Sequence, residues 1–114
     1  MKLLYSKYLP PKGFSAINIF GFIVIRSEYR EILNKYPTLR SQLINHEQIH
    51  TAQMRELLYI LFYVWYGIEW LILWCRFRFD AKKAYKNISF EKEAYQHDKD
   101  LSYLRARKRY AFLR

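Results

Sequence analysis

Hydrophobic positions recur at three- and four-residue steps across residues 38–58, the spacing of one face of an α-helix. Nothing in this stretch breaks a helix, and Pro37 stands where a first helical turn can begin. The face comprises Leu39, Leu43, His46, His50, Gln53 or Met54, and Leu57. The pattern therefore predicts a helix that points two histidines toward the core.

The preceding residues have the pattern of strands. Residues 20–25 form a β-branched and aromatic run typical of a core strand, and residues 16–19 can pair with it as a hairpin or continue it. Residues 1–13 are expected to be irregular or weakly extended, with a turn at Pro10 and Pro11. Residues 28–36 are expected to form a short helix.

Residues 57–75 carry a single formal charge, Glu69, and are long enough for a membrane-spanning helix. Their tyrosines and tryptophans are spread along the stretch, whereas spanning helices gather such residues at their two ends. We therefore favour burial in the core or in a dimer interface over membrane insertion or anchoring. The expected form is one helix or a bent pair broken near Gly67.

Residues 91–110 are predicted to form a long helix with a basic outer side. Its predicted inward positions are Tyr95, Leu101, Leu104, and Tyr110 or Ala111. Together these patterns predict an α+β, mostly helical fold: a short N-terminal strand or hairpin packed on a bundle of three to four helices. A chain of 114 residues has room for one modest core, so residues 1–114 are expected to form a single domain.

The chain is strongly basic, with a formal net charge of +10, and its cations cluster in residues 76–83 and 105–114. A solvated face is the usual explanation, but basic residues after an apolar run also resemble a membrane-surface anchor. No nucleic-acid-binding motif accompanies them, so nucleic acid is disfavoured as a partner.

The single cysteine, Cys75, excludes an internal disulfide. No secretion signal is visible, so the expected compartment is the cytoplasm, with membrane association as the alternative.

Residues 46–50 read His-Glu-Gln-Ile-His, which is the pattern His-Glu-x-x-His. On a helix His46 and His50 point two imidazoles at one spot, and Glu47 lies beside it. Two neutral imidazoles suit Zn²⁺, and a neighbouring carboxylate can take a proton from a zinc-bound water. Burying polar groups on an inward helix face costs free energy, and metal binding by the two histidines would offset that cost.

A catalytic zinc site usually has three protein ligands and one open position. His97 is the one further histidine, and Cys75 lies in an apolar run, so a carboxylate is expected as the third ligand. Glu91 and Glu93 are the candidates, early in a helix that Asn87 or Ser89 can cap. Positions two apart point to different sides of a helix, so at most one of the two binds the metal.

The chain resembles the gluzincins, a metallopeptidase class in which a later helix supplies a ligand glutamate, often as Glu-x-x-Ala-Asp or Glu-x-x-Ala-Asn. Residues 91–95 read Glu-Lys-Glu-Ala-Tyr, so the resemblance places Glu91 as the ligand and Tyr95 where the family has Asp or Asn. In the family that Asp or Asn commonly hydrogen-bonds a ligand histidine. The pair Glu93-Ala94 also resembles thermolysin, which keeps Glu93 as the alternative. In its shortness the chain is similar to the minigluzincins and to a family of small bacterial proteins.

The resemblance implies a zinc metallopeptidase acting on a peptide or protein substrate that lies along an edge strand. Zn²⁺ would be held by His46, His50 and Glu91, with Glu47 as the catalytic base. Tyr95 and His97 are candidates for stabilising the oxyanion. The alternative is a non-catalytic, zinc-stabilised or metal-free helical protein that associates with a membrane or a partner. In either case, a half-covered apolar surface at residues 57–75 would drive homo-oligomerisation.

Overall fold

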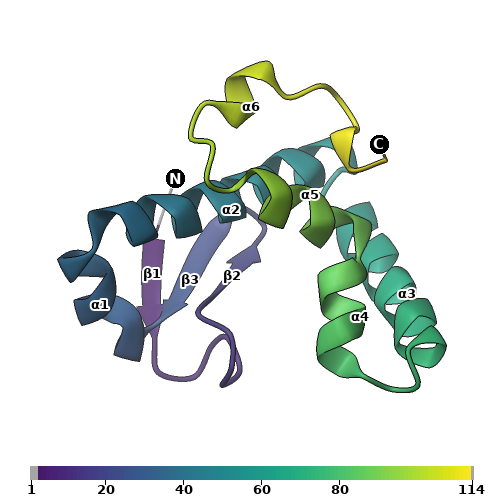
Figure 1. The fold of residues 1–114 in the computed structure, drawn as a ribbon, viewed down its shortest axis with the longest axis horizontal. Helices are drawn as coiled ribbons and strands as arrows, with labels where there is room; N and C mark the ends of the chain where they lie inside the picture. The colour runs from purple at the N-terminus through teal and green to yellow at the C-terminus, as the bar shows by residue number, and fades with distance from the viewer. Residues whose placement is uncertain (1–2, 114) are drawn as a thin grey trace.

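The computed structural model describes residues 3–113 and has a small three-stranded sheet beside six α-helices (Figure 1). The predicted α+β, mostly helical class with an N-terminal strand is confirmed. In chain order the elements are β1 (Leu3–Ser6), β2 (Ala16–Ile19), β3 (Phe22–Arg26), α1 (Arg30–Lys35), α2 (Pro37–Glu56), α3 (Ile60–Arg76), α4 (Ala81–Asn87), α5 (Ser89–His97) and α6 (Tyr103–Ala106). Short 3₁₀ turns lie at Ser27–Tyr29 and Ala111–Leu113.

The sheet has β3 at its centre, paired antiparallel with β2 and parallel with β1. The hairpin turns at Phe20 and Gly21, which both have positive φ, as tight two-residue hairpins require. The hairpin prediction is therefore confirmed, and residues 3–6 add a strand where weakly extended chain was expected. The buried side chains of Ile23 and Ile25 pack with Leu33 of α1 under α2.

Helix α2 begins with Pro37 in its first turn and extends to Glu56, as its sequence pattern predicts. Asn18 of β2 fastens the sheet to the middle of this helix. Its side-chain amide donates to the Glu47 carbonyl and to the Thr51 hydroxyl, both at 2.7 Å. Leu39 does not reach the core and is 43% exposed, because the first turns of α2 line a pocket instead.

The chain bends sharply between α2 and α3, whose axes lie at 109°. The break falls at residues 57–59, where Leu58 and Tyr59 have positive φ, and Gly67 lies inside α3. The predicted break near Gly67 is therefore wrong. No single helix within residues 3–113 has the length and apolar composition to cross a membrane; α2 and α3 meet that test only together, as the bent pair.

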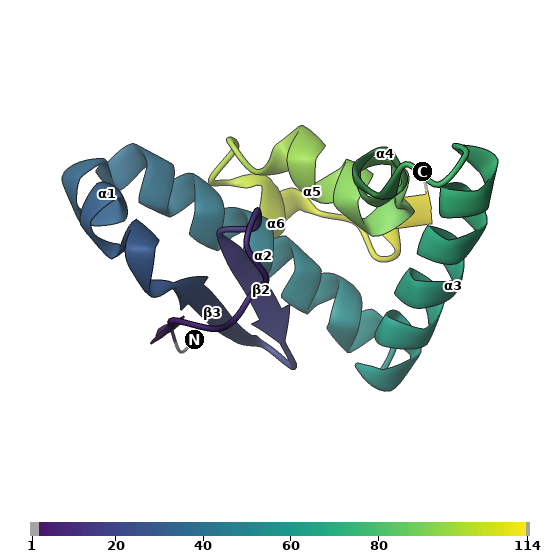
Figure 2. The same cartoon turned by 90° about the horizontal axis from the view of Figure 1, so that it is seen from below.

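The prediction that residues 57–75 are buried in the core holds for one side of α3. Phe62 is buried against Met54, Phe90 and Phe112, and the inner tyrosines and Trp70 pack around this cluster. The opposite side is exposed, because α3 forms the end of the molecule farthest from α1 and has the sheet and most other helices on one side only (Figures 1 and 2).

The predicted long helix over residues 91–110 is wrong in extent, since α5 ends at His97 and only Tyr103–Ala106 is helical beyond it. Asn45 of α2 explains the stop: its side-chain amide donates to the carbonyls of Asp98 and Asp100, at 2.9 and 3.1 Å. These carbonyls are therefore engaged by α2, not by a continuing helix. Leu101, predicted to face inward, is 63% exposed, and Tyr95 and Tyr110 are exposed as well.

The segment after α6 is tied to α2 and α5 by Arg107, whose side chain is only 5% exposed. Its guanidinium donates two hydrogen bonds of 3.0 Å to the Glu56 carboxylate and two more, of 2.5 and 3.1 Å, to Glu93. Burial tends to raise the pKa of Glu93, but Arg107, Gln53 and Tyr103 outweigh it, so that the pKa is lowered.

Replacing Arg107 with Met is expected to destabilise the protein by about 3–5 kcal/mol, because it leaves two carboxylates buried without their cation. Urea unfolding, followed by circular dichroism at equal zinc concentration, measures the change. The matched control is Arg105→Met, at an exposed arginine two residues earlier, which should shift stability by no more than about 0.5 kcal/mol. Equal stability of the two variants would rule out a structural role for this cation.

Candidate metal centre

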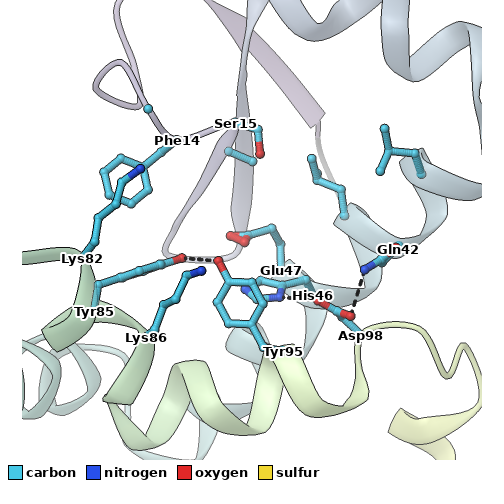
Figure 3. Close-up of a pocket in the computed structure, with 14 residues that line it drawn as sticks. Phe14, Ser15, Gln42, His46, Glu47, Lys82, Tyr85, Lys86, Tyr95 and Asp98 are labelled. Atoms are coloured by element: carbon cyan, nitrogen blue, oxygen red, sulfur yellow. Dashed lines mark hydrogen bonds and ion pairs between the residues drawn. The ribbon is translucent and has the colours of Figure 1, made fainter.

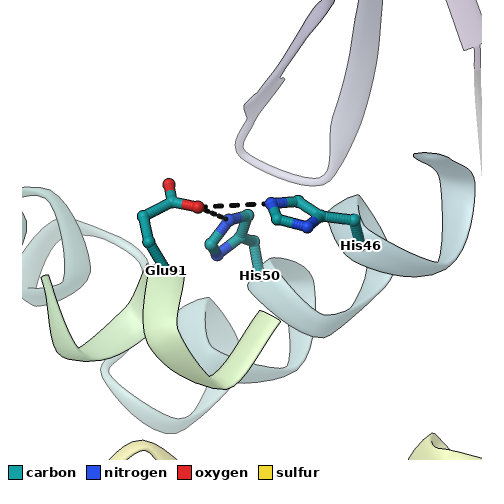
Figure 4. A group of neighbouring side chains, drawn as sticks. All are labelled: His46, His50 and Glu91. Atoms are coloured by element: carbon teal, nitrogen blue, oxygen red, sulfur yellow. Dashed lines mark hydrogen bonds and ion pairs between the residues drawn. The ribbon is translucent and has the colours of Figure 1, made fainter. Parts of the chain in front are cut away.

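Two histidines of α2 and one glutamate of α5 converge in the core (Figure 4). Glu91 Oε1 lies 3.2 Å from His46 Nε2 and 3.1 Å from His50 Nε2. One ligand atom from each of the three residues falls within 4.8 Å of the others, and all three residues are buried. Tetrahedral zinc with bonds of about 2.1 Å holds its ligand atoms about 3.4 Å apart, so these three groups are placed as a metal site requires.

The outer nitrogen of each imidazole is hydrogen-bonded, which fixes the orientation of both rings. His46 Nδ1 lies 2.9 Å from Asp98 Oδ2, and His50 Nδ1 lies 2.7 Å from Gln53 Oε1. Carboxylate and amide oxygens only accept hydrogen bonds, so both Nδ1 atoms donate. Nε2 is then the ring nitrogen of each histidine that faces Glu91, and it is the nitrogen that can bind a metal once its proton is displaced.

The electrostatics of the group favour a positive charge between these atoms. Burial tends to lower the pKa of His50, but the charge and hydrogen bond of Glu91 outweigh it and raise the pKa to about 9. The pKa of His46 is raised as well, against its burial, by the hydrogen bond with Glu91. The pKa of Glu91 is lowered, because the two histidines outweigh the effect of burial. A divalent cation satisfies the same demand for positive charge as bound protons do.

Glu47, between the two histidines in sequence, is 6% exposed and lines a pocket next to His46. Burial raises the pKa of its carboxyl, although both histidines act to lower it. A carboxylate with a raised pKa close to a metal site is suited to accept and return a proton. The hydrogen bond that Asn18 makes to the Glu47 carbonyl holds this turn of α2 against β2.

The Glu91 carboxylate is held from its other side by α3. Tyr66 donates its hydroxyl proton to Glu91 Oε2 over 2.7 Å, and burial raises the pKa of Tyr66, so the hydroxyl stays protonated. Sequence reasoning missed both Tyr66 and Asp98. For Asp98 a signal existed, because 98 − 91 = 7 residues is two helical turns after Glu91.

The other sequence candidates are not among the three converging residues. Glu93 faces away from the cluster and bonds Gln53, Tyr103 and Arg107, so it is not among the converging ligands. Tyr95 packs its ring edge-on to His46, with centroids 4.5 Å apart, and its hydroxyl bonds Tyr85. Asp98, not Tyr95, therefore makes the hydrogen bond to the ligand histidine. His97 stacks on Tyr103 and does not line the pocket.

A pocket of about 400 Å³ opens onto His46 and Glu47 (Figure 3). The start of β2 and the loop before it, the first half of α2, and helices α4 and α5 form its walls. Figure 3 shows Tyr85 and Tyr95 meeting across it through their hydroxyls, with Lys82 and Lys86 on the α4 side. His50 and Glu91 lie behind His46 and are not part of its lining. One side of the metal-ligand group is thus accessible to a molecule in the pocket.

Comparison with known protein families, with curated proteins and with solved structures finds no match for this chain. What the site itself defines is a buried group of two imidazoles and one carboxylate that can hold a metal ion. This donor set suits Zn²⁺ and also Fe²⁺.

Removing the Asp98 side chain is expected to weaken metal binding by roughly 10- to 100-fold, because it releases the His46 ring. Competition with a chelating dye measures the affinity. Asp100→Ala removes an exposed carboxylate from the same turn and should leave the affinity unchanged. If both variants bind metal as tightly as the unaltered protein, Asp98 does not position His46.

Proposed function

We propose that this chain is a zinc metallopeptidase that hydrolyses peptide bonds in a peptide or protein substrate. The observation that carries the proposal is the arrangement within two turns of α2. His46 and His50 converge on Glu91, and Glu47 is buried beside them at the wall of an open pocket. A metal site without chemistry has no need of a buried carboxylate beside the metal ligands at its accessible side.

Zinc is favoured over iron because the neighbouring Glu47 suits hydrolysis, for which zinc supplies an acidified water and a polarised carbonyl. Glu47 then has the role of general base: it accepts a proton from the attacking water and returns it to the leaving amine. Asp98 and Gln53 keep the ligand rings oriented, and Tyr66 fixes the Glu91 carboxylate.

The sheet supports a peptide as the substrate. In the strand order β1-β3-β2 the outer side of β2 is a sheet edge, and Ala16, its first residue, lines the pocket. An extended peptide can add to such an edge through backbone hydrogen bonds. A peptide bound there would pass the pocket that His46 and Glu47 line.

Incubation of the zinc-loaded protein with a mixture of synthetic peptides, read out by mass spectrometry, tests the proposal. The expected result is new peptide termini that form at fixed positions, stop when a chelator is added, and return with zinc. A protein that holds zinc tightly but cleaves none of a broad peptide set would favour the alternative, a non-catalytic zinc-stabilised protein.

A further inference from the structure

The outward side of α3 is apolar from its start to Ile72, except for the half-buried Glu69 at its margin. The exposed side chains there are Ile60, Leu61, Val64, Trp65, Ile68, Leu71 and Ile72, with Leu58 just before the helix. A surface helix normally turns its apolar stripe inward and its polar residues outward. Apolar surface gathered along a whole helix marks a binding surface.

The polar residues of α3 face the protein interior, where hydrogen bonds fix the helix in this orientation. The Tyr63 hydroxyl donates to the Asn18 carbonyl over 3.0 Å and accepts from the Phe20 amide, and the Tyr66 hydroxyl donates to Glu91. Glu69 accepts from the amide and the hydroxyl of Ser89, which begins α5. Rotating α3 to bury its apolar side would break all of these bonds, so that side must face outward.

The charge around this apolar side is positive. Arg55 precedes α3, and Arg76 and Arg78 follow it, all exposed. Six of the ten acidic residues are buried or half-buried and balance them little: Glu47, Glu56, Glu69, Glu91, Glu93 and Asp98. Of the four exposed ones, Asp80 lies two residues after Arg78 but is followed by the exposed Lys82 and Lys83, and Asp100 lies beyond α5. The exposed Glu28 and Glu31 lie at the α1 end of the molecule, opposite α3 (Figures 1 and 2).

A second copy of the chain fits this surface poorly. Each copy has a net charge of +10, and pairing two α3 surfaces would bring their flanking arginines together. An anionic bilayer matches both features of this surface. Its acyl region accepts the apolar side chains, and its headgroups attract the cations. Charge complementarity therefore selects the lipid surface.

We propose that α3 is a membrane-docking helix that lies in the surface of an anionic lipid bilayer. Its apolar side enters the boundary between headgroups and acyl chains, and Arg76 and Arg78 meet anionic headgroups. The pocket at His46 stays in water, because α4 supplies its wall on the α3 side and no residue of α3 lines it. The docking does not depend on the proposed peptidase activity.

Flotation of the full chain with vesicles tests the docking. We expect binding to phosphatidylcholine vesicles that contain phosphatidylserine, and much weaker binding to pure phosphatidylcholine or in high salt. Ile68→Gln combined with Leu71→Gln should lower the partition coefficient by at least about tenfold. Arg76→Gln combined with Arg78→Gln should lower it by roughly 25-fold in low salt, from about fivefold for each cation.

The control is Ile32→Gln, at an exposed isoleucine of α1 at the other end of the molecule, which should bind vesicles as the unaltered protein does. Circular dichroism and metal content show that each variant is folded. Absence of flotation with anionic vesicles overturns the proposal, as does undiminished flotation of the Ile68 and Leu71 variant. The surface would instead belong to a second copy of the chain if the protein forms a stable dimer that does not bind vesicles and that this double substitution dissociates.

Discussion

The Glu47→Gln variant is expected to hold zinc as the unaltered protein does and to lose peptide hydrolysis by roughly 10²- to 10⁴-fold. Glutamine keeps the shape of the side chain but cannot accept the proton of the attacking water. The three groups that converge on the metal position are left intact. Cleavage rate and zinc content, measured on the same preparation, separate the loss of chemistry from the loss of metal.

Glu31→Gln is the matched control, because it removes an exposed carboxylate of α1 far from the pocket and should retain full activity. The pair also distinguishes this protein from a contaminating protease, whose activity would be the same in both preparations. A fully active Glu47→Gln protein is incompatible with the role of Glu47 as general base.

Zinc is expected to stabilise the unaltered protein by about 4 kcal/mol when present at about a thousand times its dissociation constant. The His50→Ala variant should gain almost nothing from the same zinc, because it lacks one of the three converging ligands. Thermal unfolding with zinc and with a chelator gives, for each protein separately, the gain in free energy of unfolding that zinc produces. Any cavity left by the substitution affects both conditions equally and cancels.

His97→Ala serves as the control, since His97 stacks on Tyr103 and lies outside the cluster. Its zinc increment should equal that of the unaltered protein. An equal increment in His50→Ala would show that zinc stabilises the fold from some other position.

The part of the site on α2 could be predicted because it depends on local spacing. His46 and His50 are four residues apart on one continuous helix, and their relation needs only the helical period. Glu91 could be reached through the need for a third ligand and through the gluzincin resemblance. Asp98 lies two helical turns after Glu91, a spacing that the sequence does contain, but its bond to His46 depends on how α5 packs on α2. Tyr66 could not be predicted, because its bond to Glu91 depends on how α3 packs, which the pattern of a single segment does not contain.

The errors in the predicted fold also come from contacts between segments and from backbone conformations that a local sequence pattern does not contain. The bend after α2 rests on positive φ at Leu58 and Tyr59, a conformation that residues other than glycine seldom adopt, so Gly67 looked like the better place for a break. The helix expected over residues 91–110 is interrupted by hydrogen bonds from Asn45, which comes from another helix. Which side of α3 lies in the core depends on the polar bonds that this helix makes with β2 and α5, and those bonds leave its apolar side exposed in the single chain.

Elemental analysis of the purified protein beside its His46→Ala variant tests the central claim most directly. The geometry of His46, His50 and Glu91 predicts about one zinc per chain in the unaltered protein and almost none in the variant. If the unaltered protein holds no zinc, even after refolding with added metal, the cluster is a hydrogen-bonded part of the core and the proposed peptidase chemistry has no basis.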